Sequence, residues 1–330
     1  MTFDVITIGT ATRDAFIKSK DFHVDRDLHV LGGKGLVMPL GAKLEIPDIY
    51  FSTGGGATNS AVTFARQGFK TACIAVVGDD VSGNTVIREL ERERVKSGFI
   101  RKEKKPTAYS ILLEPPSGER TVLVYRGASE DLEGKLVPWA RVRTRWFYIS
   151  SLAGNIRLLR RVVDFARKKN IKIAYNPGGK ELKQREKLLP LLKHVSILIA
   201  NREEASLITG VSYKNEKAIF KKWDIMSPGI NVMTDARNGV WVSDGVRRYK
   251  AGIYKEKKIV DRTGAGDAFG SGFAASIMRK PKDVIRAIKL GSANATAKVE
   301  GMGAKYGLLT RREFESEKRW QRLAIKTVKI

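Results

Sequence analysis

The chain has 330 residues, of which 42% are hydrophobic and 29% charged, a balance typical of a globular protein that buries a full core. No apolar run is long enough to cross a bilayer, and the N-terminal segment carries Asp4 and lacks the basic region of a secretory signal. We therefore expect a cytoplasmic protein. The one cysteine, Cys73, excludes an internal disulfide, and its apolar surroundings indicate an inert core thiol.

The formal net charge of +26 is strongly basic. Such a balance can attract nucleic acid, an anionic membrane or acidic small substrates. Here the Lys and Arg residues are spread along the chain, are mixed with Asp and Glu, and lack the interleaved aromatic residues of a single-strand groove. No common nucleic-acid motif is present. We therefore interpret the charge as solvated helix faces and expect no nucleic-acid partner and no membrane.

Short strands alternate with helices along most of the chain. The exceptions are two irregular, β-rich stretches, which could pair into one small lid. In the first part of the chain we expect a strand at 4–9, the β-rich stretch 13–51, a helix after the glycines at 54–56, a strand at 71–78, a helix at 81–95, and a hairpin within 104–127 that turns at Pro115, Pro116, Ser117 and Gly118. In the middle we expect a strand at 146–150, a helix at 155–170, a strand at 171–176, a mostly helical segment at 181–194, a strand at 195–201 and a helix at 203–210. The last part should contain a strand at 230–234 with a hairpin partner at 239–245, a strand at 257–260, and helices at 267–279 and 284–301.

This alternation predicts βαβ units, a mainly parallel sheet and right-handed crossovers. Sheets of this kind bind ligands at the carboxyl ends of their strands. The motifs that carry chemistry all fall at that edge, so the sequence predicts one ligand site there.

The sharpest motif is Asp261-Arg-Thr-Gly-Ala-Gly-Asp267, between an expected strand and an expected helix. A glycine-rich turn at a helix N-terminus presents unpaired backbone N–H groups, and the helix dipole favours an anion there. Gly264 and Gly266 allow the backbone to approach a phosphate closely. Asp267 is then a carboxylate beside an anion site. This arrangement suits phosphoryl transfer to a hydroxyl group, in which a carboxylate takes the proton of that hydroxyl. An ordinary helix cap would explain Asp267 and one glycine but not the whole motif.

This segment is similar to the D-x-x-G-A-G-D signature of the PfkB/ribokinase family of carbohydrate and nucleoside kinases. Further landmarks follow in the family order: GGGATNSAV at 54–62, VGDD at 77–80, NREE at 201–204 for the N-x-x-E motif, and TDARNG at 234–239 for the nucleotide loop T-x-G-x-x-G. Ordered motifs are more specific than any single glycine pattern. The resemblance implies a single domain over 1–330, with an α/β three-layer sandwich around a mainly parallel sheet and a β-rich lid formed by about 13–51 and 104–127.

The resemblance also implies ATP-dependent phosphorylation of a primary hydroxyl on a sugar, sugar acid or nucleoside. It implies that the general base is Asp267, and that the anion site consists of the N–H groups of Gly264, Ala265, Gly266 and Asp267. The sugar would be bound by Asp14, Gly54, Gly55, Asn59 and Arg126. The nucleotide would be bound by Asn201, Thr234, Gly239, Gly264, Gly266 and Asn294. Mg²⁺ would be organised largely through water by Glu204 with Asn201, and a K⁺ site of some members matches Asp261 and Thr263.

Several alternatives stay open at this point. Ala236 stands at the middle glycine of the nucleotide loop, and the segment 54–59 lacks the pattern of ribokinase itself, so ribose specificity does not follow. Arg126 follows Tyr125 as in 2-keto-3-deoxygluconate kinases and fructokinases, yet it could equally be a surface arginine. A nucleoside is the main rival substrate. The rival function is a catalytically inactive kinase-like scaffold that binds nucleic acid, against which the intact Asp267 and its turn argue.

Two smaller expectations concern the lid. The GGKG at 32–35 lacks the following Ser or Thr and the preceding buried strand of a P-loop, so we interpret it as a lid turn. Exposed strand edges in the lid would favour a homodimer.

Overall fold

A computed structural model describes residues 2–26, 33–116 and 120–329 of the chain. Its described part contains a nine-stranded sheet in the order β17-β16-β15-β14-β13-β12-β11-β1-β6. The strands from β6 to β14 run parallel, and β15, β16 and β17 continue the sheet antiparallel. The strands are β1 Phe3–Ile8, β6 Thr71–Ile74, β11 Thr144–Ile149, β12 Lys172–Tyr175, β13 Ile197–Asn201, β14 Ile230–Thr234, β15 Val240–Ser243, β16 Arg247–Ala251 and β17 Ile325–Lys329.

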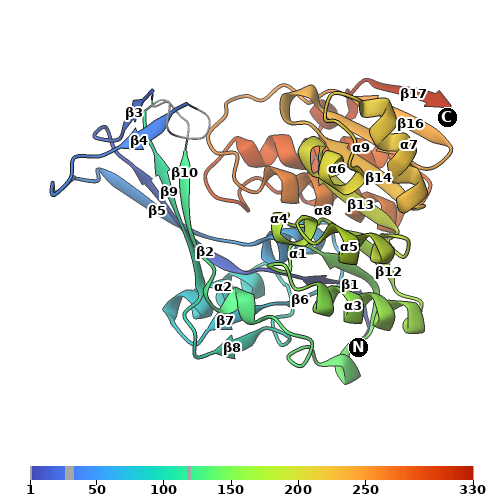
Figure 1. Cartoon of the computed structure of the whole chain (residues 1–330), viewed down its shortest axis with the longest axis horizontal. Helices are drawn as coiled ribbons and strands as arrows, with labels where there is room; N and C mark the ends of the chain where they lie inside the picture. Colours follow the sequence, from blue (N-terminus) through green and yellow to red (C-terminus); the bar gives the residue numbers. More distant parts are fainter. Residues whose placement is uncertain (1, 27–32, 117–119, 330) are drawn as a thin grey trace.

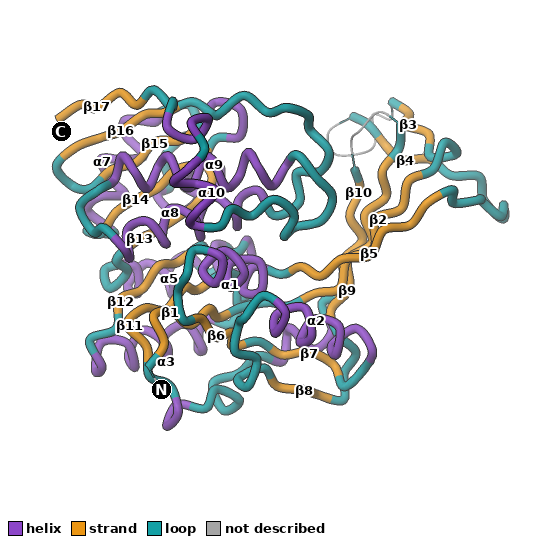
Figure 2. Tube along the Cα trace, turned by 180° about the vertical axis from the view of Figure 1, so that it is seen from behind, coloured by secondary structure: helices purple, strands orange, loops and turns teal. Residues whose placement is uncertain are grey.

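Helices cover both faces of this sheet (Figures 1 and 2). One face carries α3 Ile156–Lys169, α4 Gly179–Leu182, α5 Arg185–Leu192, α6 Arg202–Thr209 and α7 Glu216–Met226. The other face carries α1 Gly56–Arg66, α2 Val81–Arg92, α8 Ala265–Arg279, α9 Val284–Val299 and α10 Arg311–Ser316. The predicted α/β three-layer arrangement around a mainly parallel sheet is confirmed.

The period of two along each strand builds the two cores between these layers. On β11, Phe147 packs into the core beneath α3 and α5, whereas the next residue, Tyr148, packs into the core beneath α8 and α9. Both side chains are fully buried. Central strands of this sheet are therefore apolar on both faces, which is why they appear in the sequence as continuous apolar runs.

The two β-rich stretches of the sequence form one small sheet, in the order β10-β9-β2-β5. Figure 1 shows it projecting from the side of the three-layer body. Its central strand β2 pairs antiparallel with β5 and parallel with β9, so residues far apart in sequence are joined. Its strands are β2 Thr12–Lys18, β5 Asp48–Gly54, β9 Ala108–Glu114 and β10 Thr121–Tyr125.

The outer strands of this small sheet expose large apolar side chains. The exposed residues include Ile49, Tyr50 and Phe51 on β5 and Val122, Leu123, Val124 and Tyr125 on β10. Homodimerisation through these strands stays a prediction. The GGKG segment lies at the short hairpin β3 His23–Asp25 and β4 Gly35–Val37, with Gly32 outside the described residues. Ser117 and Gly118 of the predicted hairpin turn also lie outside them.

Some expected elements differ from the structure. The expected strand at 71–78 is divided into β6 and β7 Val76–Gly78, and β7 leaves the large sheet to pair with β8 Arg101–Glu103. Residues 257–260 form no strand, although the N–H of Val260 donates to the carbonyl of Val299 at 2.8 Å. Within the described ranges, no helix has the length and apolar character needed to span a membrane.

Candidate active site

Asp267 lies where the N-termini of two helices meet. Helix α8 begins at Ala265 after Gly264, which has a φ of 77°, so Asp267 belongs to the first helical turn. The Nδ2 atom of Asn59, on α1, donates a hydrogen bond to Oδ2 of Asp267 at 2.9 Å. A Cβ atom on Gly56, the first residue of α1, would lie 3.4 Å from Oδ1 of Asp267. Two predicted site residues that are far apart in sequence are thus brought into direct contact.

The surroundings of Asp267 raise the pKa of its carboxyl above the usual range. The main cause is burial, to which repulsion from the carboxylate of Asp14 adds. The hydrogen bond from Asn59 and the charge of Lys305 act in the opposite direction, because they favour the ionised form. A carboxylate with a raised pKa in a site is a stronger base than an exposed one, as proton transfer from a hydroxyl requires.

Asp14 stands on β2 beside the glycines that precede α1. Its side chain is buried, and Oδ1 accepts a hydrogen bond from Oγ1 of Thr12 at 3.0 Å. A Cβ atom on Gly54 would lie 2.1 Å from Oδ2 of Asp14, and one on Gly55, where φ is 95°, would lie 2.4 Å from the carbonyl oxygen of Thr10. Both glycines are therefore required for β5 to pass close to β2 on its way into α1.

The two glycines of the turn before α8 differ in what surrounds them. A Cβ atom on Gly264 would lie 2.8 Å from Cβ of Ala304, and its φ lies in the left-handed region, so packing alone requires glycine there. A Cβ atom on Gly266 would meet nothing within 4 Å apart from its chain neighbours and the nearby backbone of its own helix. The free space beside Gly266 borders the N–H groups of the first turn of α8, which have no partners within the helix.

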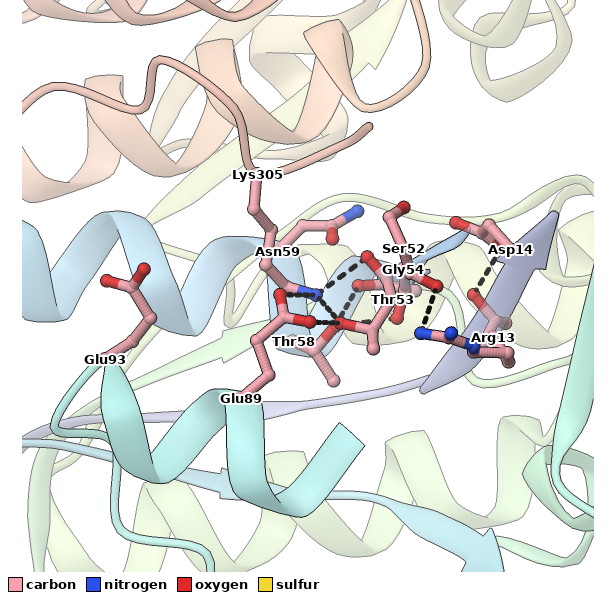
Figure 3. A network of polar contacts seen from close by, with 12 residues as sticks. Arg13, Asp14, Ser52, Thr53, Gly54, Thr58, Asn59, Glu89, Glu93 and Lys305 are labelled. Atoms are coloured by element: carbon pink, nitrogen blue, oxygen red, sulfur yellow. Dashed lines mark hydrogen bonds and ion pairs between the residues drawn. The ribbon is translucent and has the colours of Figure 1, made fainter. Parts of the chain in front are cut away.

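Lys305 is a site neighbour that the sequence did not reveal. Its buried Nζ atom donates to the carbonyl oxygen of Thr53 at 2.8 Å and to Oγ1 of Thr53, and it forms an ion pair with Oε1 of Glu89 at 3.3 Å. Figure 3 shows Lys305 descending from the loop after α9 to a network beside Asn59. Burial lowers the pKa of Lys305, and Glu89 opposes that shift. No local pattern in the sequence marks a lysine that is buried in this way.

Asn201 and Thr234 lie side by side at the carboxyl ends of β13 and β14, where they are paired in register. Asn201 and Glu204 form a capping box at the start of α6: Oδ1 of Asn201 accepts from the N–H of Glu204, and Oε2 of Glu204 accepts from the N–H of Asn201, both at 2.8 Å. Burial and the nearby carboxylates of Glu203 and Asp267 raise the pKa of Glu204. Glu204 therefore lies within electrostatic range of Asp267.

These carboxylates fit a hydrated Mg²⁺ better than a fully protein-bound ion. The described residues include no group of three or more His, Cys, Asp or Glu that could hold a metal directly. Mg²⁺ in phosphate-transfer sites keeps several waters and needs only one or two carboxylates. The mutual repulsion of Glu204 and Asp267 would be relieved by a cation between them.

The nucleotide loop after β14 keeps a tight turn despite its missing glycine. Gly239 has a φ of 90°, and a Cβ atom there would lie 2.1 Å from the carbonyl oxygen of Ala251. Ala236, at the departure from the family pattern, adopts a φ of 44°. An alanine in this left-handed region carries a strain of about 1–2 kcal/mol. The loop thus bends at Ala236 where the family pattern has glycine.

Asn294, which the resemblance assigns to the nucleotide, has a structural role in the core. Asn294 is fully buried between α9, α1 and α8. Its Nδ2 donates to the carbonyl oxygen of Ala268 at 2.8 Å and to Oγ1 of Thr63 at 3.2 Å, and its Oδ1 accepts from the N–H of Leu309 at 2.8 Å. Because its hydrogen-bonding groups all have partners in the core, Asn294 holds three elements together and is not available to a ligand.

The predicted K⁺ site at Asp261 and Thr263 also needs correction. The carboxylate and the carbonyl of Asp261 both bind the buried ammonium group of Lys298. The N–H of Thr263 donates to Oδ1 of Asp261 at 2.8 Å. The ammonium group of Lys298 therefore already occupies acceptors of Asp261, so Asp261 does not fit a monovalent cation, whereas Oγ1 of Thr263 is buried without a hydrogen-bond partner. Arg126 directly follows β10 and has an exposed side chain, and within the described ranges it makes no hydrogen bond or ion pair with Asp14, Asn59 or Asp267.

The arrangement of a basic carboxylate, the N–H groups of a helix N-terminus and a buried aspartate at the edge of a parallel sheet is that of a small-molecule kinase. Residues 29–311 match the model of the pfkB family carbohydrate kinases. The chain belongs to this family and is a kinase.

Its relatives act on different acceptors. It is 28% identical over 268 residues to a ribokinase of Haemophilus influenzae, with 79% of this chain and 85% of the relative covered. It is 26% identical over 265 residues to a cytidine kinase of Thermococcus kodakarensis, with 77% and 89% covered. A putative ribokinase II from E. coli, solved in complex with ATP and Mg²⁺, superposes with a TM-score of 0.80 at 19% identity and covers 98% of this chain and 100% of its own. That structural likeness shows the ribokinase fold.

Proposed function

We propose that this protein transfers the γ-phosphoryl group of ATP to a primary hydroxyl of a sugar or sugar acid. The observation that carries the proposal is the position of Asp267, which is in contact with Asn59, lies within electrostatic range of Asp14 and belongs to the first turn of α8. Two comparisons support ATP-dependent phosphorylation: the match to the carbohydrate kinase family, and the E. coli neighbour that was solved with ATP and Mg²⁺.

In the proposed reaction the acceptor hydroxyl lies against the carboxylate of Asp267. Asp267 takes the hydroxyl proton while the acceptor oxygen bonds to the γ-phosphorus, and the bond from that phosphorus to the bridging oxygen breaks to leave ADP. The N–H groups at Gly264–Asp267 stabilise the charge on the transferring group. Asp14, Gly54, Gly55 and Asn59 would hold the acceptor, and Arg126 could meet its far end.

The nucleotide would lie on the side of Asn201, Thr234 and Gly239. Glu204 and Asn201 would hold Mg²⁺ through water, and Mg²⁺ supplies neutralisation of phosphate charge when it is bound. A cavity of about 1060 Å³ adjoins the turn before α8 at Asp261. Its lining includes the basic residues Lys18, Lys20, Arg120, Arg237 and Arg262. A concave surface with this charge attracts a polyphosphate.

The small sheet would act as the lid of this site. The sequence prediction gives this lid as about 13–51 and 104–127, and the small sheet of β2, β5, β9 and β10 lies largely within those ranges and carries Asp14 on β2. Arg120, just before β10, donates from Nη1 to Oδ1 of Asp261 at 3.0 Å, so the sheet reaches the catalytic turn. A lid that closes over the acceptor excludes water, which would otherwise receive the phosphoryl group.

A panel of acceptors tests the proposed function. ADP release from MgATP should be measured with ribose, fructose, 2-keto-3-deoxygluconate, adenosine and cytidine. We expect turnover with at least one sugar or sugar acid. Turnover only with a nucleoside would replace the acceptor class, and no turnover with any of them would contradict the proposal.

Replacing Asp14 by Ala should chiefly weaken acceptor binding. Asp14 is buried on the proposed acceptor side, and its carboxylate interacts with the hydroxyl groups of Thr12 and Ser110. A lost hydrogen bond to a charged group weakens binding by roughly 1.5–3 kcal/mol, which is about 10- to 100-fold in the acceptor KM. Steady-state kinetics at saturating ATP measure this. An unchanged acceptor KM would show that the acceptor site has been misplaced.

Replacing Gly266 by Ala should separate function from stability. The added methyl group meets nothing within 4 Å beyond its chain neighbours and its own helix backbone, and alanine favours a helix over glycine by about 0.5–1 kcal/mol, so thermal stability should stay equal or rise. The methyl group would occupy the proposed phosphate space, so kcat/KM should fall by about 10²-fold. Gly264→Ala is the matched comparison, because its methyl group would clash with Ala304 and should lower stability. Normal activity in Gly266→Ala would place the phosphate elsewhere.

A further inference from the structure

Lys298 carries a fully buried charge directly beneath the catalytic turn. It stands near the end of α9, and its side chain has 0% exposure. Its Nζ donates to the carbonyl oxygen of Asp261 at 2.6 Å and lies 3.1 Å from Oδ2 of the same residue. A buried ammonium group is expensive in free energy unless it is paired and hydrogen-bonded, and Asp261 supplies both kinds of partner.

Asp261 in turn is held from several sides. Its side chain has 0% exposure. Oδ1 accepts from the N–H of Thr263 at 2.8 Å and from Nη1 of Arg120 at 3.0 Å, and Oδ2 accepts from the N–H of Gly303 at 3.1 Å as well as from Lys298. Asp261 therefore connects three segments: the turn before α8, the loop after α9 and the small sheet. The ammonium group of Lys298 lies at the centre of this junction.

We propose that the ammonium group of Lys298 is a built-in substitute for a dissociable monovalent cation, so that this kinase orders its catalytic turn without K⁺. An ammonium group and K⁺ carry the same charge and have similar size, and both bind carbonyl and carboxylate oxygens. The lysine differs in being tethered, so its site is filled at any salt concentration. Lys298 is a positioning residue, because it acts through Asp261 on the N–H groups at Gly264–Asp267.

The electrostatics of the junction agree with this role. Burial lowers the pKa of Lys298 and Arg120 adds to that effect, whereas the charge and hydrogen bond of Asp261 oppose it. Glu114, at the end of β9, also favours the charged form. The network therefore contains carboxylates that hold a cation in place on both the core side and the small-sheet side.

The first test uses the wild-type protein in KCl, NaCl and choline chloride at equal ionic strength. The thermal unfolding midpoint and the affinity for MgATP by calorimetry should be the same in all three salts. A K⁺-specific rise in either quantity would overturn the proposal, because a bound ion stabilises the state that binds it. Neither measurement needs an acceptor, so this test stands apart from the proposed function. Only the activity readout below rests on that function.

The second test compares Lys298→Ala with Lys298→Met. Alanine leaves space and free acceptors on Asp261, whereas methionine fills the space without a charge. In choline chloride both variants should bind MgATP about 10- to 100-fold more weakly than the wild type, the typical effect of disturbing groups around an ion site. KCl should restore affinity, unfolding midpoint and kcat in the alanine variant but not in the methionine variant.

Lys289→Ala is the matched control, since Lys289 lies on the same helix and donates to the carbonyl of Gln321 at 2.9 Å away from the site. It should show no K⁺ effect. Full MgATP affinity of Lys298→Ala in choline chloride, or equal rescue of the alanine and methionine variants, would overturn the proposal. If Lys298→Ala folds in KCl but not in choline chloride, the proposal is supported. If it folds in neither salt, the comparison of the wild-type protein in KCl, NaCl and choline chloride decides whether the proposal holds.

Discussion

Replacing Asp267 by Asn should lower kcat by about 10²–10⁴-fold, the usual contribution of a general base. Asparagine keeps the size of the side chain but cannot take the acceptor proton. Binding of MgATP, measured by calorimetry, should stay near the wild-type value, because the N–H groups of the first turn of α8 are unchanged.

Two outcomes would contradict this assignment. A near-normal rate in Asp267→Asn would mean that another group accepts the proton. A loss of ATP affinity equal to the loss of rate would mean that Asp267 organises the nucleotide and does not act as a base. Asn59→Ala is a useful companion, because Asn59 donates to the Asp267 carboxylate and favours its ionised form.

The same carboxylate should control the acid limb of the pH–rate profile. Asp267 must be ionised to accept a proton, and burial raises its pKa above the usual range of aspartate. Activity should therefore fall as the pH decreases, at a higher pH than an exposed aspartate would give. In Asn59→Ala this limb should move to still higher pH, because the hydrogen bond that lowers the Asp267 pKa is lost.

Much of the fold follows from patterns that a single sequence contains. Parallel strands buried on both faces appear as apolar runs, and amphipathic helices lie between them, so the order of β11, α3, β12 and β13 could be predicted. The last two strands of the chain could not, although the edge strand β6 could. The sequence of β16 is RRYKA and that of β17 is IKTVK, and such charged, half-exposed segments have little periodic signal.

The local parts of the site could also be predicted, because Gly264, Gly266 and Asp267 are neighbours in sequence. Their partners could not be found from local chemistry. Asn59 and Asp267 are 208 positions apart, and the family resemblance assigned both to one site without predicting their hydrogen bond. A polar residue on a helix can either bind a ligand or make hydrogen bonds within the core, and the residue type of Asn294 alone does not distinguish the two. The small residues around it, in LGSANATA, are a sign of close helix packing that favoured burial.

The buried lysines escaped prediction for a different reason. Lysine is almost never fully buried, so composition assigns every lysine of a basic chain to the surface. Lys298 and Lys305 are exceptions because each meets a carboxylate that the fold brings from elsewhere, Asp261 in one case and Glu89 in the other. Only the three-dimensional pairing distinguishes them from the many exposed lysines.

Replacing Lys305 by Met should affect stability and chemistry together. The ammonium group binds Thr53, on β5, and Glu89, on α2, so its loss removes a charged donor from both, although Glu89 keeps the hydrogen bond that Oγ1 of Thr53 donates to its Oε2 at 2.8 Å. Hydrogen bonds to charged groups contribute roughly 1.5–3 kcal/mol, and Glu89 is partly exposed and can be hydrated, so we expect a loss of about this size in the free energy of unfolding. Denaturant unfolding measures it. Lys326→Met, at an exposed lysine of β17, should change little.

The chemical effect of Lys305→Met has a definite sign. The charge of Lys305 lowers the pKa values of both Asp267 and Asp14. Without it the pKa of Asp267 rises further, so the acid limb of the pH–rate profile should move to higher pH in Lys305→Met and stay in place in Lys326→Met. The rate at high pH, where Asp267 is ionised in either case, should be less affected than the rate at low pH. An unchanged acid limb together with lowered stability would restrict Lys305 to a structural role, because a cation that sets the charge of the base must alter its titration.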